Sequence, residues 1–107
     1  MDSHLIYTVC SNLKGKANWN EWIYCGVGDD MKEDIVSNAI NQYFQDSILF
    51  YVSTRKESRE INKQDIVERI KKDLPLYEIY IWNTTFKKAI EFNKIGVMRN
   101  GLVPNAI

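Results

Sequence analysis

The segment 31-MKEDIVSNAINQYFQDSILFYVS-53 decides the fold class, because it joins a helical pattern directly to a strand pattern. Apolar residues recur at helical spacing over residues 31–44, which predicts an amphipathic helix, and Asp29 or Asp30 can cap its start. Residues 48–53 form a short continuous apolar run rich in aromatic side chains. Such a run is typical of a strand covered on both faces, so the segment predicts a helix packed on a sheet.

The same two patterns recur on both sides of this segment. Strands are expected at four further places: residues 5–10, 22–27, 78–82 and 95–98. Helices are expected at two: residues 66–74, ending before Pro75, and a short stretch from Thr84 or Thr85 to Phe92. Asn100-Gly101 is expected in a tight turn. The order is then β-β-α-β-α-β-α-β, and alternation of this kind favours parallel neighbours. We therefore predict an α/β fold in two or three layers, with a mixed sheet of about five strands and three helices.

Length and composition restrict the class of protein. The chain has 107 residues, of which 45% are apolar and 26% charged, so one globular domain over residues 1–107 is expected. Lys+Arg 14 balances Asp+Glu 14, which gives no bulk attraction to nucleic acid or to an anionic membrane. The longest apolar run, residues 48–52, is far shorter than the ~20 residues of a membrane helix. Residues 1–4 lack the basic start of a signal peptide, so a cytoplasmic protein is expected.

Residues suited to catalysis are sparse. His4 is the single histidine, and Cys10 and Cys25 are the only cysteines, which we expect to be reduced and buried. The stretch 25-CGVGDDM-31 lies where a phosphate-binding loop would lie, but its third glycine is missing and its two aspartates would repel phosphate. We therefore expect no enzyme, no cofactor and no metal site.

Two other functions stay open. A small-ligand or catalytic domain would use the rim beyond the carboxyl ends of parallel strands, which would gather Asp29, Asp30, Arg55, Lys56, Asn83 and Thr84. A nucleic-acid-binding module would use the lysines and arginines between Arg55 and Lys72. Acidic residues are interleaved among these cations, however, which is more typical of a solvated helix face.

The best candidates for a binding site are acidic and aromatic. Asp29, Asp30, Glu33 and Asp34 form an acidic group at the start of the predicted helix, and Trp19 and Glu21 lie in a polar loop. A tryptophan in such a loop either packs back on the core or serves as a binding anchor, and both readings stay open. An acidic surface suits a nuclease, because a nuclease site is basic in order to hold phosphate.

In size and architecture, the whole chain resembles the small immunity proteins of bacterial contact-dependent growth inhibition and other polymorphic toxin systems. The likeness is carried by overall architecture and by these candidates, and not by a motif. It implies a cytoplasmic inhibitor that binds one cognate toxin domain, often a nuclease, and covers its active site. The partner is then a protein, and neither nucleic acid nor a membrane. The residues predicted to touch it are Trp19, Glu21, Asp29, Asp30, Glu33 and Asp34.

Overall fold

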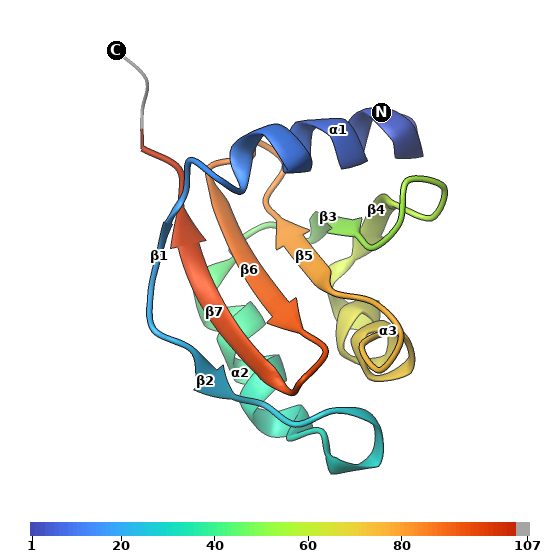
Figure 1. Cartoon of the computed structure of the whole chain (residues 1–107), viewed down its shortest axis with the longest axis vertical. Coiled ribbons are helices and arrows are strands. Elements are labelled where there is room, and N and C mark those ends of the chain that lie inside the picture. Colours follow the sequence, from blue (N-terminus) through green and yellow to red (C-terminus); the bar gives the residue numbers. More distant parts are fainter. Residues whose placement is uncertain (105–107) are drawn as a thin grey trace.

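The computed structural model describes residues 1–104, which form an α/β domain around one seven-stranded sheet (Figure 1). The strands are β1 (Asn18–Trp19), β2 (Ile23–Tyr24), β3 (Ile48–Val52), β4 (Arg59–Asn62), β5 (Ile79–Trp82), β6 (Lys88–Asn93) and β7 (Val97–Leu102). Their order is β1-β7-β6-β5-β3-β4, and β2 also pairs with β7. Every pairing is antiparallel. The predicted mixed sheet of about five strands with parallel neighbours is therefore wrong in both strand count and direction.

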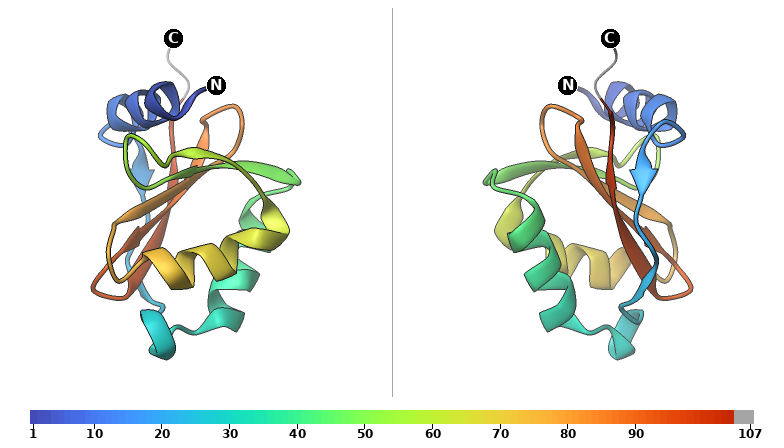
Figure 2. Two further views of the ribbon diagram at one scale, coloured as in Figure 1. Left: turned by 90° about the vertical axis from the view of Figure 1, so that its right-hand side faces the viewer. Right: turned by 90° about the vertical axis from the view of Figure 1, so that its left-hand side faces the viewer.

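Three helices cover the sheet, as predicted in number. They are α1 (Ser3–Leu13), α2 (Glu33–Tyr43) and α3 (Ile66–Asp73), and two short 3-10 turns, η1 (Gly28–Asp30) and η2 (Lys63–Asp65), precede α2 and α3. Helices α2 and α3 pack on one face of the sheet, and α1 packs on the opposite face near one end of the strands (Figure 2). The domain is thus three layers deep where α1 lies and two layers deep elsewhere.

Four predicted elements are confirmed with small shifts in their bounds. They are the central pair α2 and β3, the helix α3 that ends before Pro75, and the strand β5. Their apolar patterns match their burial, since β3 buries four consecutive residues, Leu49 to Val52, between the two helical layers.

The first predicted strand is a helix. Residues 5–10 belong to α1, because Asp2 caps the helix by accepting a hydrogen bond at Oδ1 from the Leu5 amide at 2.8 Å. Ile6 and Cys10, one turn apart, then bury one side of the helix against the sheet. A local cap and i, i+4 spacing therefore outweigh the β-branched composition of this segment.

The last predicted helix is a strand. Residues 88–93 form β6, which lies between β5 and β7 and is hydrogen-bonded on both sides. Ile90 and Phe92 face α2 and α3, while Ala89 and Glu91 face the other way, and all four are buried. The segment 95–98 continues as β7 through Asn100 and Gly101, so the predicted turn there is also wrong. Burial on both faces hid the alternation that marks a strand.

Two apolar cores result from this alternation. The larger one lies between the sheet and helices α2 and α3 and includes Phe44, Tyr51, Ile70 and Phe92. The smaller one lies between the sheet and α1, and it is centred on Trp82.

Candidate interaction surface

The predicted acidic group lies on one exposed surface. Asp29 and Asp30 are in η1, and Glu33 and Asp34 are in the first turn of α2, and all four side chains are exposed. The Lys32 amide donates to the Cys25 carbonyl at 2.7 Å, which fixes the turn that carries η1. We call these four residues the acidic group; they lie at the lower end of the molecule in Figure 1.

The acidic group is only partly neutralised. Glu33 Oε2 lies 3.2 Å from Lys71 Nζ on α3, and both side chains are more than one-third exposed. Such an exposed pair contributes little to stability, but it orients Glu33. The start of α2 also favours these carboxylates, because the helix dipole is positive there.

Trp19, which was predicted to contact a partner, packs on the sheet and is separate from the acidic group. Its Nε1 donates to the Lys14 carbonyl at 2.9 Å, and its ring lies so close over Gly101 that any Cβ there would overlap it. Trp19 pairs with Gly101 near the end of β7, whereas the acidic group lies beyond the beginning of β7 (Figure 1). Glu21 is exposed in the link between β1 and β2. The six predicted contact residues therefore do not form a single patch.

A second exposed surface, which is apolar, was not predicted from the sequence. Trp22, Ile23 and Tyr24, in and just before β2, have exposed fractions of 42%, 51% and 59%. Ile95, at 77%, lies in the β6–β7 turn, whose Gly96 carbonyl accepts hydrogen bonds from the Cys25 and Gly26 amides at 2.8 and 2.9 Å. We call these four residues the apolar edge. Their pattern predicts a strand but does not reveal that the strand lies at an uncovered edge of the sheet.

A polar cluster supports the apolar edge from behind. The Arg99 guanidinium lies 4.9 Å from the ring centre of Trp19 and 4.2 Å from that of Trp22. Its Nε donates to Glu91 at 2.8 Å, and the Tyr80 hydroxyl donates to the other oxygen of Glu91 at 2.7 Å. Burial and the Glu91 carboxylate raise the pKa of Tyr80 above its usual value. Glu91, only 6% exposed, therefore holds the Arg99 side chain against which Trp22 rests.

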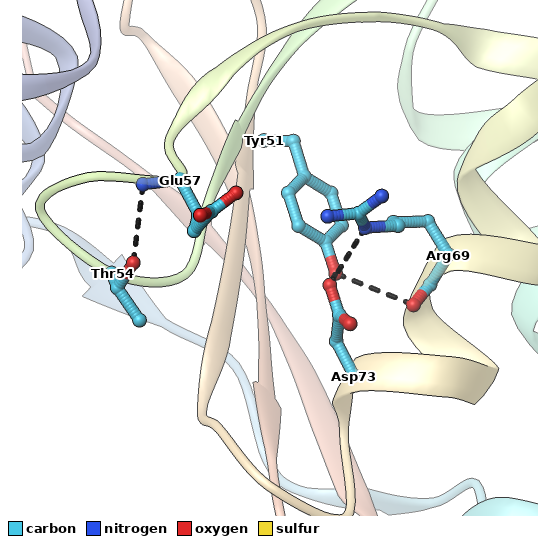
Figure 3. A network of polar contacts seen from close by, with 5 residues as sticks. All are labelled: Tyr51, Thr54, Glu57, Arg69 and Asp73. Carbon is cyan, nitrogen blue, oxygen red and sulfur yellow. Dashed lines mark hydrogen bonds and ion pairs between the residues drawn. The ribbon is translucent and has the colours of Figure 1, made fainter.

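A separate buried network joins α3 to the sheet (Figure 3). The Tyr51 hydroxyl and the Arg69 Nε both donate to Asp73 Oδ2, each at 2.8 Å. Burial, together with the Asp73 carboxylate, raises the pKa of Tyr51. In the nearby turn after β3, the Glu57 amide donates to the Thr54 hydroxyl at 3.1 Å. Each polar group here has a partner within the protein, so we assign the network to stability.

The cysteines are buried in different cores. Cys10 belongs to the core under α1 and Cys25 to the core under α2 and α3, on opposite faces of the sheet, and both are free thiols. Burial raises the pKa of each thiol to about 11, which keeps them protonated at neutral pH. His4 is exposed on α1. Within residues 1–104, no group of three or more histidine, cysteine or acidic side chains could hold a metal ion. No helix in that range is both long and apolar enough to cross a bilayer.

The ligand-binding rim expected beyond the carboxyl ends of parallel strands is not formed. Neighbouring antiparallel strands have their carboxyl ends at opposite ends of the sheet. Asn83 instead closes the β5–β6 turn, where its Oδ1 accepts from the Lys87 and Lys88 amides at 2.9 and 3.0 Å. That turn lies near α1, away from Asp29 and Asp30 (Figure 1).

The cations of α3 and β4 do not form a basic surface. Arg59, Arg69 and Lys72 share a 430 Å³ cavity with Asp65 and Glu68. Its charges are therefore mixed, and Arg69 is already bound to Asp73.

Comparisons of the chain with protein families, curated proteins and solved structures gave no match. The likeness to immunity proteins therefore stays a prediction about architecture.

Proposed function

We propose that this protein is an inhibitor of the immunity-protein kind, which binds a cognate toxin domain and covers a basic active site. The observation that carries the proposal is the position of the apolar edge beside the acidic group. β2 leads through residues 25–27 directly into η1, so both surfaces lie at the same end of the domain (Figure 1).

The apolar edge has the composition of an interface centre. Tryptophan and tyrosine are enriched among the residues that dominate protein–protein binding, and they act from the middle of a patch with a polar rim. The Tyr24 backbone is fixed by the pairing of β2 with β7, and the Trp22 ring lies against Arg99. A fixed anchor loses little conformational entropy on binding, which favours affinity.

The acidic group supplies the charge for a basic partner. Four exposed carboxylates in η1 and the first turn of α2 attract a positively charged site over a distance of about 8 Å at physiological salt. This kind of attraction acts mainly on the rate of association. A nuclease domain, whose site is basic because it holds phosphate, fits both surfaces.

The test is neutralisation of the toxin encoded beside this gene in its native genome, with the two proteins co-expressed and binding measured by surface plasmon resonance. Trp22→Ala/Tyr24→Ala should weaken binding at least ~30-fold, since a single anchor of this type already contributes about 2 kcal/mol. Ile48→Ala is the matched control, because Ile48 is 42% exposed, like Trp22, but lies on β3.

The charge reversal Asp30→Lys/Glu33→Lys/Asp34→Lys should slow association about tenfold or more at low salt and leave dissociation nearly unchanged. Glu57→Lys/Glu60→Lys, at exposed sites in and just before β4, is its control. If no neighbouring toxin is neutralised, or if both sets of variants protect cells as well as the wild type does, the proposal is wrong.

A further inference from the structure

A cleft of about 310 Å³ lies between α1 and the open part of the sheet, and it adjoins the apolar edge at Lys94, the neighbour of Ile95 in the β6–β7 turn. Its walls come from α1, the end of β3, the α3–β5 loop, β5 and the β6–β7 turn. Buried Cys10 and Val52 form its floor. The cleft lies within the size range of small-molecule sites, about 300–1,000 Å³.

The cleft is rich in hydrogen-bond donors that the protein leaves unused. Lys14 and Lys94 both line it, and Lys94 has no ion-pair partner among residues 1–104. Four hydroxyl groups in the lining also have no hydrogen-bond partner in that range: those of Tyr7, Ser11, Ser53 and Tyr77. An oxygen-rich ligand in this recess could accept hydrogen bonds from several of these groups at once.

The charge of the lining favours an anion. Two lysines face a single carboxylate, Glu78, and that carboxylate already accepts a hydrogen bond from Asn93 Nδ2 at 3.1 Å. The Cys10 thiol contributes no negative charge at neutral pH, because burial raises its pKa to about 11. Lys14 Nζ is held 5.2 Å from the ring centre of Tyr80, which positions it inside the cleft. The lining therefore carries a net positive charge.

The mouth of the cleft offers an apolar wall. Tyr77, 40% exposed, has no ring partner among the described residues, and Leu76 beside it is 66% exposed. A flat ring stacked on Tyr77 would cover both side chains. Such a contact is favourable in itself and adds to the burial of apolar surface.

We propose that this cleft binds a small organic anion, in which a phosphate or carboxylate group contacts Lys14 and Lys94 and a planar ring packs on Tyr77. The recess is too small for a polymer, so a free small molecule is favoured over nucleic acid. The protonated lysine amines and the hydroxyl groups would together donate hydrogen bonds to the oxyanion, as is usual for phosphate sites that contain lysine.

Calorimetric titration and thermal shift of the full chain test the proposal with four probes. They are adenosine monophosphate, adenosine, inorganic phosphate and benzoate, each up to millimolar concentration. We expect saturable binding of adenosine monophosphate, of benzoate, or of both, and each result identifies which oxyanion the cleft accepts. Adenosine and inorganic phosphate, which each lack one half of the ligand, should bind at least tenfold more weakly.

Lys14→Ala and Lys94→Ala should each weaken the binding about tenfold, the effect of losing one charge-assisted hydrogen bond. Tyr77→Ala should weaken it more than Tyr77→Phe, which keeps the ring. Lys56→Ala, at an exposed lysine outside the cleft, is the matched control.

Because both cleft lysines are exposed, these variants should fold normally, which circular dichroism checks. Failure of all four probes to bind, or equal binding by the Lys14→Ala/Lys94→Ala variant and the wild type, would overturn the proposal. Toxin neutralisation by the Lys14→Ala variant should be unchanged, because Lys14 belongs neither to the apolar edge nor to the acidic group, and this result separates the cleft from the proposed interface.

Discussion

Tyr51→Phe removes one hydroxyl from the buried network between β3 and α3, and the structure indicates how much this should cost. The ring is fully buried and stays in place in the variant. The lost hydrogen bond, 2.8 Å long, ends on the Asp73 carboxylate, and bonds to charged groups contribute about 1.5–3 kcal/mol. Asp73 keeps its Arg69 partner at 2.8 Å, so we expect the lower part of this range, about 1.5–2 kcal/mol. In a domain of this size, the melting temperature should fall by roughly 10 °C.

The pH dependence gives this prediction a second, independent readout. Burial and Asp73 raise the pKa of Tyr51 in the folded state above the value of about 10 found in an unfolded chain. The stabilising contribution is therefore complete below pH ~10 and is lost as the pH rises further, because the unfolded tyrosine then releases its proton and the folded one keeps it. The slope is about 1.4 kcal/mol per pH unit. The phenylalanine variant has no hydroxyl to titrate at this position. The difference in the free energy of unfolding between wild type and variant should therefore become smaller above pH ~10.

Urea denaturation at pH 7 to 11, followed by tryptophan fluorescence and circular dichroism, measures both effects. Tyr24→Phe is the control, because Tyr24 is 59% exposed and donates no hydrogen bond within residues 1–104, so its stability should change by less than about 0.5 kcal/mol. A Tyr51→Phe protein as stable as the wild type at pH 7, or a gap that stays constant up to pH 11, would refute the reasoning.

Three further predictions concern other contacts. Arg99→Lys keeps the charge but loses the Nε hydrogen bond to Glu91, so denaturation should show a loss of about 1 kcal/mol, and an unchanged midpoint would contradict this role. Gly101→Ala places a methyl group where the Trp19 ring lies, so we expect a red-shifted tryptophan emission and a cost of about 1–3 kcal/mol, whereas a native spectrum would argue against the contact. Both cysteine thiols are buried with a pKa of about 11, so iodoacetamide at pH 8 should modify them only in denaturant, as mass spectrometry would show.

The central part of the fold could be predicted from the sequence because its local signals agree with its tertiary contacts. In α2 the apolar spacing matches the buried stripe of Val36 and Ile40, and in α3 the same holds for Ile66 and Ile70. Towards the two ends of the sequence, α1 was predicted as a strand and β6 as a helix, for opposite reasons. In α1 the cap at Asp2 outweighs a composition that favours strands, while in β6 pairing with strands on both sides outweighs a helical spacing.

Those two errors account for part of the predicted parallel sheet. The rest comes from β4, a strand that was not predicted, which reverses the chain after β3 so that β3 and β5 pair antiparallel. A helix between β5 and the final strand would require a crossover, whereas the observed short turn between β5 and β6 makes a hairpin, and hairpins are antiparallel. The predicted number of helices agrees with the structure only because one was missed and one was added.

The candidate surface could be predicted only where it depends on local sequence. The acidic group follows from four nearby residues at a helix start, and the structure places them together on an exposed surface. The exposure of Trp22 and the packing of Trp19 depend on which strand lies at the edge and on the absence of a side chain at Gly101. Both are consequences of long-range pairing with β7, which leaves no trace in a stretch of neighbouring residues.

The pairing of β1 and β2 with β7 alone also sets an order on folding during synthesis. Residues 18–24 are made well before their strand partner, residues 97–102. Until β7 is made, the aromatic side chains of residues 18–24 have no sheet to pack against. In the same way, α1 cannot bury its apolar side chains before β5 and β6 are made. The nascent chain therefore exposes these aromatic side chains until β7 has been made, and apolar surface that is exposed in this way is prone to aggregation during synthesis.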